Sequence, residues 1–399
     1  MSRNNNNYDV IIIGGGASGL LCAAALNMKN PAIKGLVIEK NSKPGRKLLA
    51  TGNGRCNFTN KNITSAVYYT DDKDKLQRIL DVYTFEKIIE VFSRDLGIIP
   101  AYKGDLVYPI TYQSKTVCEA LAAACASCDM LYDTEVISVK REGLNYVVNG
   151  TYSALYVVFA CGGVSLPDSG SNGSLYPVLR SFTGNTSFEK LLPSLVPLKT
   201  SDKDLKRLSG IRQECTVTLD GVTEQGEILF TDYGISGICV MQLSGIYNRA
   251  VSEGKRIDAV YVDLIPSMND EQKLNTVKEL INRFPDRKPE DAISGLLKKQ
   301  LAQCVVARSD GSCESIASVI GNFRISLNGS LGFENAQVTS GGVKLSSLTD
   351  SLEAVESHGV FVCGEAVNVD GICGGYNLHW AWSSALLVSD AILDLLEVD

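Results

Sequence analysis

The chain has 399 residues, of which 45% are hydrophobic and 21% charged, and its formal net charge is −7. This length predicts two or three domains of an ordinary globular protein, and the acidic balance argues against a general affinity for nucleic acid or anionic membranes. The polar residues 2–7 lack the pattern of a signal peptide, and no apolar segment is long enough to span a bilayer. We therefore expect a cytoplasmic protein with 12 reduced cysteines and a frayed asparagine run at residues 4–7.

The first predicted unit has the layout of a dinucleotide-binding motif. A β-branched apolar run at residues 8–13 predicts a buried strand, and the pattern Gly-x-Gly-x-x-Gly follows it from Gly14 to Gly19. A helix is predicted over residues 20–26 and a second strand over residues 35–38, directly before the acid Glu39. This order binds the adenosine diphosphate half of a dinucleotide, whereas the glycine pattern alone is weak evidence and is also compatible with a structural turn.

Each glycine of this turn has a separate expected role. Gly14 permits the tight turn, Gly16 lets the backbone approach a pyrophosphate, and Gly19 lets the helix pack closely on the strand. The helix N-terminus offers N–H groups and a positive dipole end to the phosphates. Glu39 is placed to accept hydrogen bonds from ribose hydroxyls.

Residues 40–60 form a long segment of Gly, Asn, Thr and basic residues with little periodicity. Long ordered loops of this kind are usually functional. Its cations Arg46, Lys47 and Arg55 lie between glycines, where they could neutralise a pyrophosphate or a substrate anion. Solvated surface charges are the alternative interpretation.

More elements are predicted before residue 190. Helical patterns occupy residues 73–83, 85–96 and 116–126, a short strand 107–110, and a hairpin 133–140 with 144–148. A buried strand over residues 152–160 ends in Cys161-Gly162-Gly163. A strand that ends in glycines is typical of the ligand-binding edge of a parallel sheet.

One pair of cysteines, Cys125 and Cys128, has C-x-x-C spacing at the end of the helix over residues 116–126. A zinc site would need a second such pair, which the sequence lacks. The pair is either a redox dithiol or, as we expect, two small packing residues. Since His358 and His379 are the only histidines, a histidine-rich metal site is excluded.

The character of the sequence changes near residue 191. Strand patterns occupy residues 214–219, 226–230, 259–264, 323–328 and 335–339, and helical patterns run to residue 250 and over residues 270–283, 288–301 and 313–321. We interpret residues 191–340 as an inserted cap, partly β and partly α, between two parts of a nucleotide domain at residues 1–190 and 341–399.

The last sixty residues contain a second glycine-rich site. A strand over residues 359–365 ends in Gly364-Glu365, and a loop at residues 370–376 leads into a helix over residues 377–396. Glu365 is placed for the ribityl hydroxyls or the pyrophosphate of a flavin nucleotide. The N-terminus of the Asn377 helix would face the N1 and O2 edge of the flavin ring. An ordinary loop-to-helix junction capped by Asn377 is the alternative.

These segments resemble a known family. The sequence is similar to the BaiN-type bacterial NAD(P)/FAD-dependent oxidoreductases, which include proteins called aminoacetone oxidases. The motifs that carry the resemblance lie at residues 44–49, 52–60, 193–198, 226–231, 234–237, 338–343, 364–365 and 370–378. The chain departs from the family pattern at Cys161, Asn185 and His379, where Thr, His and Gln are common.

The resemblance implies an α/β fold: a Rossmann-like FAD-binding domain of a two-dinucleotide-binding-domain flavoprotein, with an inserted β-barrel-like and helical cap. The β-barrel-like part would comprise residues 191–266 and 322–340, and the helical part residues 267–321. It also implies non-covalent FAD. The predicted cofactor-binding residues are Gly14, Gly16, Ala17, Ser18, Gly19, Glu39, Lys40, Arg46, Lys47, Gly54, Arg55, Cys56, Asn57, Val136, Ala160, Cys161, Gly162, Gly364, Glu365, Gly375, Tyr376, Asn377 and Leu378; no metal ligand is predicted.

The predicted activity is hydride transfer through the flavin N5 atom. A dithiol mechanism is not expected, because Lys61 stands where flavin disulfide reductases carry the second cysteine after Cys56. The resemblance suggests NAD(P)H-dependent reduction of a conjugated C=C bond in a small 3-oxo bile-acid-like steroid. Oxidation of an aminoacetone-like amine by oxygen, and an FAD protein that assists RNA modification, are the alternatives; no nucleic acid or membrane partner is expected.

The sequence does not identify the electron donor or the catalytic acid or base. No second Gly-x-Gly-x-x-Gly follows a strand, so a nicotinamide would bind transiently or not at all. Tyr108, Tyr376 and His379 are acid or base candidates by location only.

Overall fold

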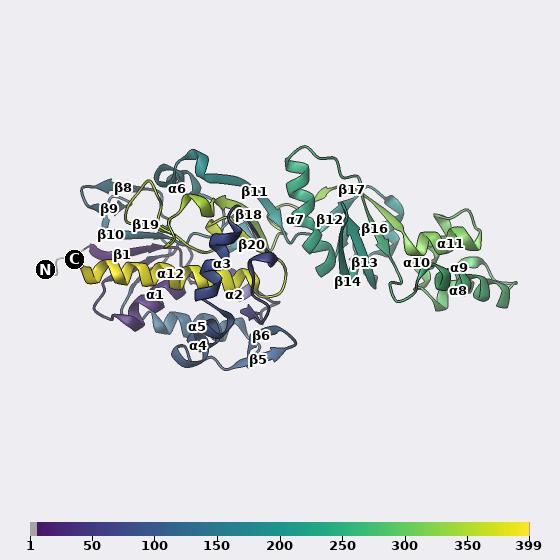
Figure 1. The fold of residues 1–399 in the computed structure, drawn as a ribbon, viewed down its shortest axis with the longest axis horizontal. Helices are drawn as coiled ribbons and strands as arrows, with labels where there is room; N and C mark the ends of the chain where they lie inside the picture. Colours follow the sequence, from purple (N-terminus) through teal and green to yellow (C-terminus); the bar gives the residue numbers. More distant parts are fainter. Residues whose placement is uncertain (1–5, 399) are drawn as a thin grey trace. The chain divides into compact units, whose positions relative to one another are not determined.

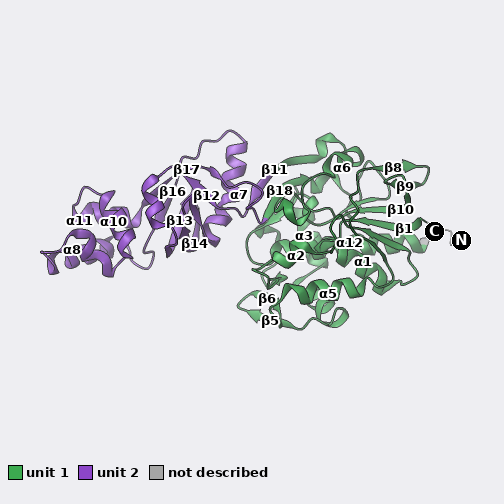
Figure 2. Ribbon diagram, turned by 180° about the vertical axis from the view of Figure 1, so that it is seen from behind, with its two compact units in different colours: residues 1–191, 338–399 green, residues 192–337 purple. Residues whose placement is uncertain are grey.

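The computed structural model describes residues 6–398, and the chain divides into two compact units. Unit 1 contains Met1–Leu191 and Val338–Asp399, and unit 2 is Leu192–Gln337 (Figure 2). The chain passes from unit 1 to unit 2 in β11 (Phe188–Ser194) and returns in β18 (Val338–Val343), and these two strands pair.

Unit 1 is built on a mainly parallel sheet, seven-stranded among the described residues, in which β1 (Asn7–Ile13) pairs with β2 (Gly35–Ile38) and β10 (Tyr152–Phe159). Its other strands are β7 (Asp129–Leu131), which pairs with β2, β19 (Val360–Val362) and β9 (Asn145–Val148), which both pair with β10, and β8 (Val139–Glu142). The residues from Val10 to Ile13 are at most 1% exposed. Such a continuous β-branched run is typical of a parallel strand covered on both faces.

The helices α1 (Ala17–Lys29) and α12 (Tyr376–Val398) pack against each other beside this sheet (Figure 1). Ala23, Ala24 and Ala25 of α1 are at most 1% exposed. Small side chains let a second helix approach closely, so this alanine run explains how the two ends of the chain meet in one layer.

Shorter elements surround this core of unit 1. The helices are α2 (Arg46–Ala50), α3 (Lys73–Val82), α4 (Phe85–Glu90) with a π-helical turn (Val91–Asp95), α5 (Ser114–Ala124) and α6 (Tyr176–Thr183). The strands are β3 (Thr59–Asn60), β4 (Tyr68–Thr70), β5 (Pro100–Lys103), β6 (Leu106–Pro109) and β20 (Val369–Gly371).

Unit 2 contains a closed barrel and a group of helices. The barrel strands, in order, are β12 (Leu198–Thr200), β15 (Gly234–Ser236), β14 (Val222–Phe230), β13 (Arg212–Leu219), β16 (Ala259–Asp263) and β17 (Phe323–Ser330). Along β13, Cys215, Val217 and Leu219 are fully buried and alternate with more exposed residues, which is the period of a strand with one face in a core. The helices are α7 (Ile238–Ser252), α8 (Asp270–Arg283), α9 (Pro289–Ala292), α10 (Lys299–Ala307) and α11 (Cys313–Gly321).

Several predicted elements differ in their bounds from the structure. The helix predicted over residues 288–301 is interrupted after Ala292 at Ser294-Gly295, which have low helix propensity. Residues 133–138 are not a strand, and the backbone N–H groups of Ile137 and Ser138 donate to the Asn149 side-chain oxygen instead. The strand predicted at 335–339 is β18, which begins at Val338.

The predicted frayed asparagine run lies partly outside the described residues, and Asn7 already belongs to β1. Among residues 6–398, none of the helices is both long and apolar enough to cross a membrane.

Candidate flavin nucleotide site

The three glycines of the first turn face different surroundings. Gly14 has φ +110°, and a Cβ on it would lie 2.5 Å from the Ala160 carbonyl oxygen. A Cβ on Gly19 would lie 1.9 Å from the Gly14 carbonyl oxygen, whereas a Cβ on Gly16 would meet nothing within 4 Å. Gly14 and Gly19 are thus required by contacts within the protein, and Gly16 faces open space.

Gly16 is also the N-cap residue of α1. The first intrahelical bond runs from the Leu20 N–H to the Gly16 carbonyl oxygen, 2.9 Å, and no described side chain caps this helix end. The first turn contains no acidic residue. Uncapped N–H groups at the positive end of a helix dipole form an anion site.

Glu39 is held at the end of β2, beside the glycine turn. Its Oε2 accepts from the Gly15 N–H at 2.8 Å, and its Oε1 accepts from the backbone and side-chain nitrogens of Asn41 at 2.8 and 2.7 Å. The carboxylate is buried, with 7% of the residue exposed. Because a carboxylate offers about four acceptor positions, Oε2 retains one for a further donor.

The residues around Glu39 form a connected loop. Arg46 donates to the Asn41 side-chain oxygen at 3.1 Å, and the Asn41 amide donates to the Ser169 carbonyl at 3.2 Å. Lys40 precedes Asn41 in this loop, and Val136 is buried in the segment before β8.

The two ends of the chain meet at this edge of the sheet. Gly364 follows β19, and a Cβ on it would lie 2.4 Å from the Ser18 hydroxyl of α1. Glu365 Oε2 contacts the Lys47 ammonium at 2.5 Å, and its Oε1 accepts from the Thr339 N–H at 2.7 Å. Both side chains of the ion pair are about one-fifth exposed. Three segments therefore form one cluster: the glycine turn at residues 14–19, the basic loop at residues 40–60, and Gly364-Glu365 after β19.

The end of β10 completes this cluster. Ala160 contacts Gly14, and Gly162 accepts a 3.4 Å hydrogen bond from the Tyr176 hydroxyl through its carbonyl oxygen. Burial raises the pKa of the Cys161 thiol to about 12, so this thiol is protonated at neutral pH.

The second glycine loop, residues 370–376, contacts the segment from Asn57 to Asn60. Gly375 has φ +92°, and a Cβ on it would lie 2.7 Å from the Thr59 carbonyl oxygen and 2.9 Å from Asn57 Oδ1. The Asn60 amide donates to the Gly374 carbonyl at 2.9 Å. This contact places Asn57 beside Gly375, with Gly54, Arg55 and Cys56 preceding it in the same loop.

Asn377 closes the glycine loop on itself. Its side chain accepts from the Gly371 N–H and donates to the Gly371 carbonyl, both at 2.8 Å. The helix starts one residue earlier than predicted, at Tyr376, and Leu378 packs partly buried against the core. The Asn377 side chain is therefore a loop brace rather than a cap on its own helix.

Cys56 is a packing residue in the basic loop. It is fully buried with φ +56°, and burial raises the pKa of its thiol to about 12. A thiol in this state is a poor nucleophile. Its neighbour Arg55 lies with its guanidinium 5.8 Å from the centroid of the Tyr108 ring.

The acid and base candidates differ in their surroundings. His379 is fully buried, with Nδ1 2.8 Å from the Thr59 hydroxyl and Nε2 3.0 Å from the Tyr83 carbonyl oxygen. Burial lowers its pKa to about 4, so the ring is neutral at pH 7 and both nitrogens are occupied. Burial raises the pKa of Tyr376, and the Tyr108 ring lies 5.5 Å from that of Tyr112. Both ring nitrogens of His379 are thus used for contacts within the protein.

Sequence reasoning missed two threonines at this site. Thr59 contacts both His379 and Gly375, and the hydroxyl of Thr339 accepts from the N–H groups of Val164 and Ser165 at 2.8 and 3.0 Å. Both threonines lie inside motifs that the sequence analysis recognised, but the sequence does not show which residues they contact.

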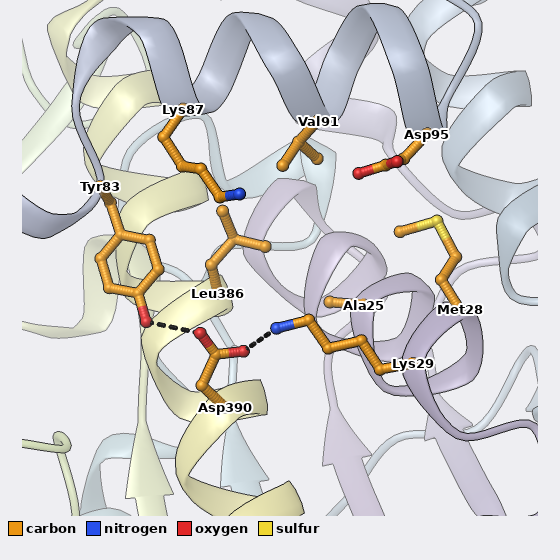
Figure 3. Close-up of a pocket in the computed structure, with 9 residues that line it drawn as sticks. All are labelled: Ala25, Met28, Lys29, Tyr83, Lys87, Val91, Asp95, Leu386 and Asp390. Carbon is orange, nitrogen blue, oxygen red and sulfur yellow. Dashed lines mark hydrogen bonds and ion pairs between the residues drawn. The ribbon is translucent and has the colours of Figure 1, made fainter.

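A separate cavity of about 370 Å³ lies elsewhere in unit 1 (Figure 3). Asp390 lines it, accepts from the Tyr83 hydroxyl at 2.8 Å and pairs with the Lys29 ammonium. The other lining residues are Ala25, Met28, Lys87, Val91, Asp95 and Leu386. Met28 lies roughly 18 Å along α1 from Gly16. None of the predicted cofactor-binding residues lines this cavity.

Comparison with known proteins identifies the family. A model of the HI0933-like protein Rossmann domain matches residues 8–391. A 3-dehydro-bile acid delta(4,6)-reductase of Clostridium scindens is 30% identical over 397 residues, which cover 94% of this chain and 96% of the relative. Ribosomal RNA dihydrouridine synthases of Haemophilus influenzae and Escherichia coli are 31% and 29% identical, over 92% of this chain and 94% of each relative.

Solved structures with a similar fold include a 3-ketosteroid dehydrogenase and a fumarate reductase. The 3-ketosteroid delta1-dehydrogenase of Sterolibacterium denitrificans matches with a TM-score of 0.53 at 13% identity, over 98% of this chain and 100% of the other. Escherichia coli quinol fumarate reductase matches with a TM-score of 0.51 at 14% identity, over 97% of this chain and 70% of the other. The predicted fold class and the predicted resemblance are confirmed. The chain belongs to the HI0933-like family, has the Rossmann-type fold of FAD-binding flavoproteins and is an oxidoreductase.

Proposed function

We propose that this protein is an FAD-dependent reductase of a carbon–carbon double bond conjugated to a carbonyl group. The observation that supports it most directly is the close approach of Ser18 and Gly364. This contact brings the two glycine-rich segments of the chain together beside Gly16, which faces open space. One extended dinucleotide needs an anchor for its pyrophosphate and another for its far ring, and this cluster offers both.

The residues present fit the adenosine diphosphate half of FAD. The pyrophosphate would lie over Gly16, at the uncapped N–H groups of Ala17 and Ser18. The free acceptor position of Glu39 suits a ribose hydroxyl. Lys40, which follows Glu39, and Arg46, which donates to Asn41, would supply positive charge for the two phosphates.

The flavin half would lie along the basic loop and the second glycine loop. Gly375 lies against Asn57 and Thr59, and Glu365, which pairs with Lys47, lies beside Gly163. When bound, the flavin supplies hydride transfer through its N5 atom. The chain positions the ring, since the Gly375–Thr59 contact and the Asn377 brace hold the loop in one conformation.

The first candidate substrate is a 3-oxo steroid of the bile-acid type. The Clostridium scindens relative is named for reducing such a molecule, and its match covers almost all of both chains. The fold is also that of a steroid dehydrogenase.

The second candidate substrate is a uracil base in RNA. Dihydrouridine is uridine with hydrogen added across the ring C=C bond, which is conjugated to a carbonyl, so both groups of relatives are named for one kind of chemistry. The acidic net charge argues against RNA, but the local charge does not. Residues 40–62 contain six Lys and Arg and no Asp or Glu.

An anaerobic experiment tests this function. Purified yellow protein is mixed with NADH or NADPH, and loss of the flavin absorbance shows that the nicotinamide is the transient reductant. A 3-oxo-4,6-diene bile acid or uridine-containing ribosomal RNA is then added, and return of the absorbance identifies the acceptor. Bleaching by aminoacetone without any nicotinamide, with no reoxidation by either acceptor, would show an amine oxidase instead.

A further inference from the structure

Two cysteines of unit 2 lie on different elements and meet at one glycine. Cys215 is on β13 and Cys239 is in the first turn of α7, and both are fully buried. Cys215 is opposite Gly226 of β14 in the strand register, and its Sγ lies 3.5 Å from the Gly226 carbonyl oxygen. A Cβ on Gly226 would lie 3.6 Å from the Cβ and 3.9 Å from the Sγ of Cys239. The two thiols therefore lie against the same glycine, and they are hydrogen-bonded to each other.

Cys239 has the surroundings of an activated thiol. It is the second residue of α7, and the N-cap residue of this helix, Gly237, provides no side-chain cap. The hydrogen bond from Cys215 and those from the backbone N–H groups of Val240 and Cys239 lower the pKa of the Cys239 thiol against the opposite effect of burial. The hydrogen bond to Cys239 and burial raise the pKa of Cys215. The pair thus combines a sulfur that ionises more readily with a protonated partner.

The C-x-x-C pair of unit 1 has different surroundings. Cys125 Sγ lies 3.4 Å from the Leu20 carbonyl oxygen, and Cys128 Sγ lies 3.8 Å from that of Ala23, so both thiols have acceptors on α1. Burial raises the pKa of Cys125 to about 12 and that of Cys128 to about 11. Both are therefore protonated at neutral pH, which makes them poor nucleophiles.

The Cys215–Cys239 pair is shielded from solvent by a thin layer of the protein. Gly226, against which both cysteines lie, is itself partly exposed, and Ile238, which precedes Cys239, is 64% exposed. Because reaction of a thiol depends on access as well as on its ionisation, a small oxidant should reach the pair slowly and a bulky one should not reach it.

We propose that Cys215 and Cys239 form a reversible disulfide when the protein meets hydrogen peroxide. The Cys239 sulfur attacks one peroxide oxygen, the O–O bond breaks, and the second oxygen leaves as water with the Cys239 proton. The Cys215 sulfur then attacks the sulfenic acid on Cys239. An S–S bond forms, the S–O bond breaks, and the hydroxyl leaves as a second water with the Cys215 proton. The two sulfurs lose two electrons in total, and these reduce the peroxide to water.

The disulfide would join two elements of unit 2 covalently. α7 and β13 share only noncovalent contacts while the thiols are reduced. A cross-link between them closes the chain between residues 215 and 239 and restricts the unfolded state of this segment. Oxidation should therefore make unit 2 more resistant to unfolding. The flavin takes no part in this reaction, so this inference does not depend on the proposed function.

The test treats the flavin-loaded protein with hydrogen peroxide, then alkylates the remaining thiols in denaturant and maps the peptides by mass spectrometry. We expect two of the 12 thiols to be lost. The peptides of Cys215 and Cys239 should be linked, with a mass decrease of about 2 Da that a dithiol reductant reverses. The midpoint of chemical denaturation should rise on oxidation in the wild type.

Variants separate the roles of the two sulfurs. Cys239→Ser should lose the cross-link and the rise in denaturation midpoint, whereas Cys215→Ser should leave a sulfenic acid on Cys239 that dimedone traps. The double variant Cys125→Ser with Cys128→Ser is the matched control and should still form the cross-link. Oxidised glutathione, a bulky oxidant, should form no mixed disulfide with Cys215 or Cys239.

Three results on the wild-type protein would overturn this inference, so that it stays testable even if a variant does not fold. These are retention of all 12 thiols in peroxide, a cross-link at Cys125 and Cys128 in place of Cys215 and Cys239, and sulfinic acid on Cys239 without a cross-link. A mixed disulfide with glutathione would contradict the shielded position of the pair.

Discussion

The Nδ1 atom of His379 lies 2.8 Å from the hydroxyl of Thr59, and the two residues are fully buried. The contact joins the first turns of α12 to β3. The Thr59 carbonyl oxygen also lies against Gly375. Thr59 therefore holds the glycine loop at residues 370–376 against the segment of residues 40–60. The other ring nitrogen of His379, at the Tyr83 carbonyl, links the same helix to the residue that follows α3.

His379 makes stability depend on pH. Its folded pKa is lowered from 6.5 to about 4, so the unfolded chain takes up a proton first as the pH falls. The free energy of unfolding should be unaffected above pH 6.5 and should decrease between pH 6.5 and 4, by on the order of 3 kcal/mol. In His379→Gln, whose amide can accept and donate as the neutral ring does, this part of the pH dependence should disappear. Denaturant titrations across this range measure it. An identical pH profile in the two proteins would contradict the assignment of a neutral ring.

Gly16 and Gly19 should respond differently to the same change. Gly16→Ala should fold with an unchanged melting temperature but lose FAD, because the added methyl group occupies only the open space proposed for the pyrophosphate. Gly19→Ala should be destabilised by several kcal/mol, since its methyl group would overlap the Gly14 carbonyl oxygen. Thermal unfolding and the flavin absorbance of the purified proteins separate the two effects. Full FAD content in Gly16→Ala would place the pyrophosphate elsewhere.

Gly375→Ala should be more damaging than its backbone angle alone predicts. Gly143, in the β8–β9 turn, also has a positive φ of +67°, but a Cβ there would meet nothing within 4 Å. Gly143→Ala therefore measures the conformational cost alone, about 1 kcal/mol. Gly375→Ala adds the collision with Thr59 and should also weaken FAD binding. Equal melting temperatures for the two variants would refute the close packing of this loop on β3.

The Lys47–Glu365 pair should show strong coupling in a double-mutant cycle. Lys47→Met leaves a carboxylate that is one-fifth exposed with only the Thr339 N–H as a partner. We expect a loss of about 1–3 kcal/mol, partly restored when Glu365→Gln is added. Chemical denaturation of the four proteins, prepared without flavin, gives the coupling energy. Additive effects would mean that the ion pair does not contribute to the meeting of the two chain ends.

Local patterns predicted the first glycine turn well for a physical reason. Gly14 and Gly19 are five residues apart, and the contact that requires both is made within one turn of chain. Elements with long regular patterns, such as β1 and α8, were predicted for the same reason. The helix over residues 288–301 was not, because Ser294-Gly295 interrupts a pattern whose apolar period continues on both sides.

The sequence by itself indicated the nucleotide-binding layout and the family, because each of the motifs that carry them is made of residues close together in the chain. The tertiary structure decided which distant residues meet. Lys47 and Glu365 are 318 positions apart, and Thr59 and His379 are 320. Their contacts depend on how α1, α12 and the sheet pack as a whole, which no local pattern encodes. This packing also buries His379 with both ring nitrogens in contact with distant parts of the chain, Thr59 and Tyr83.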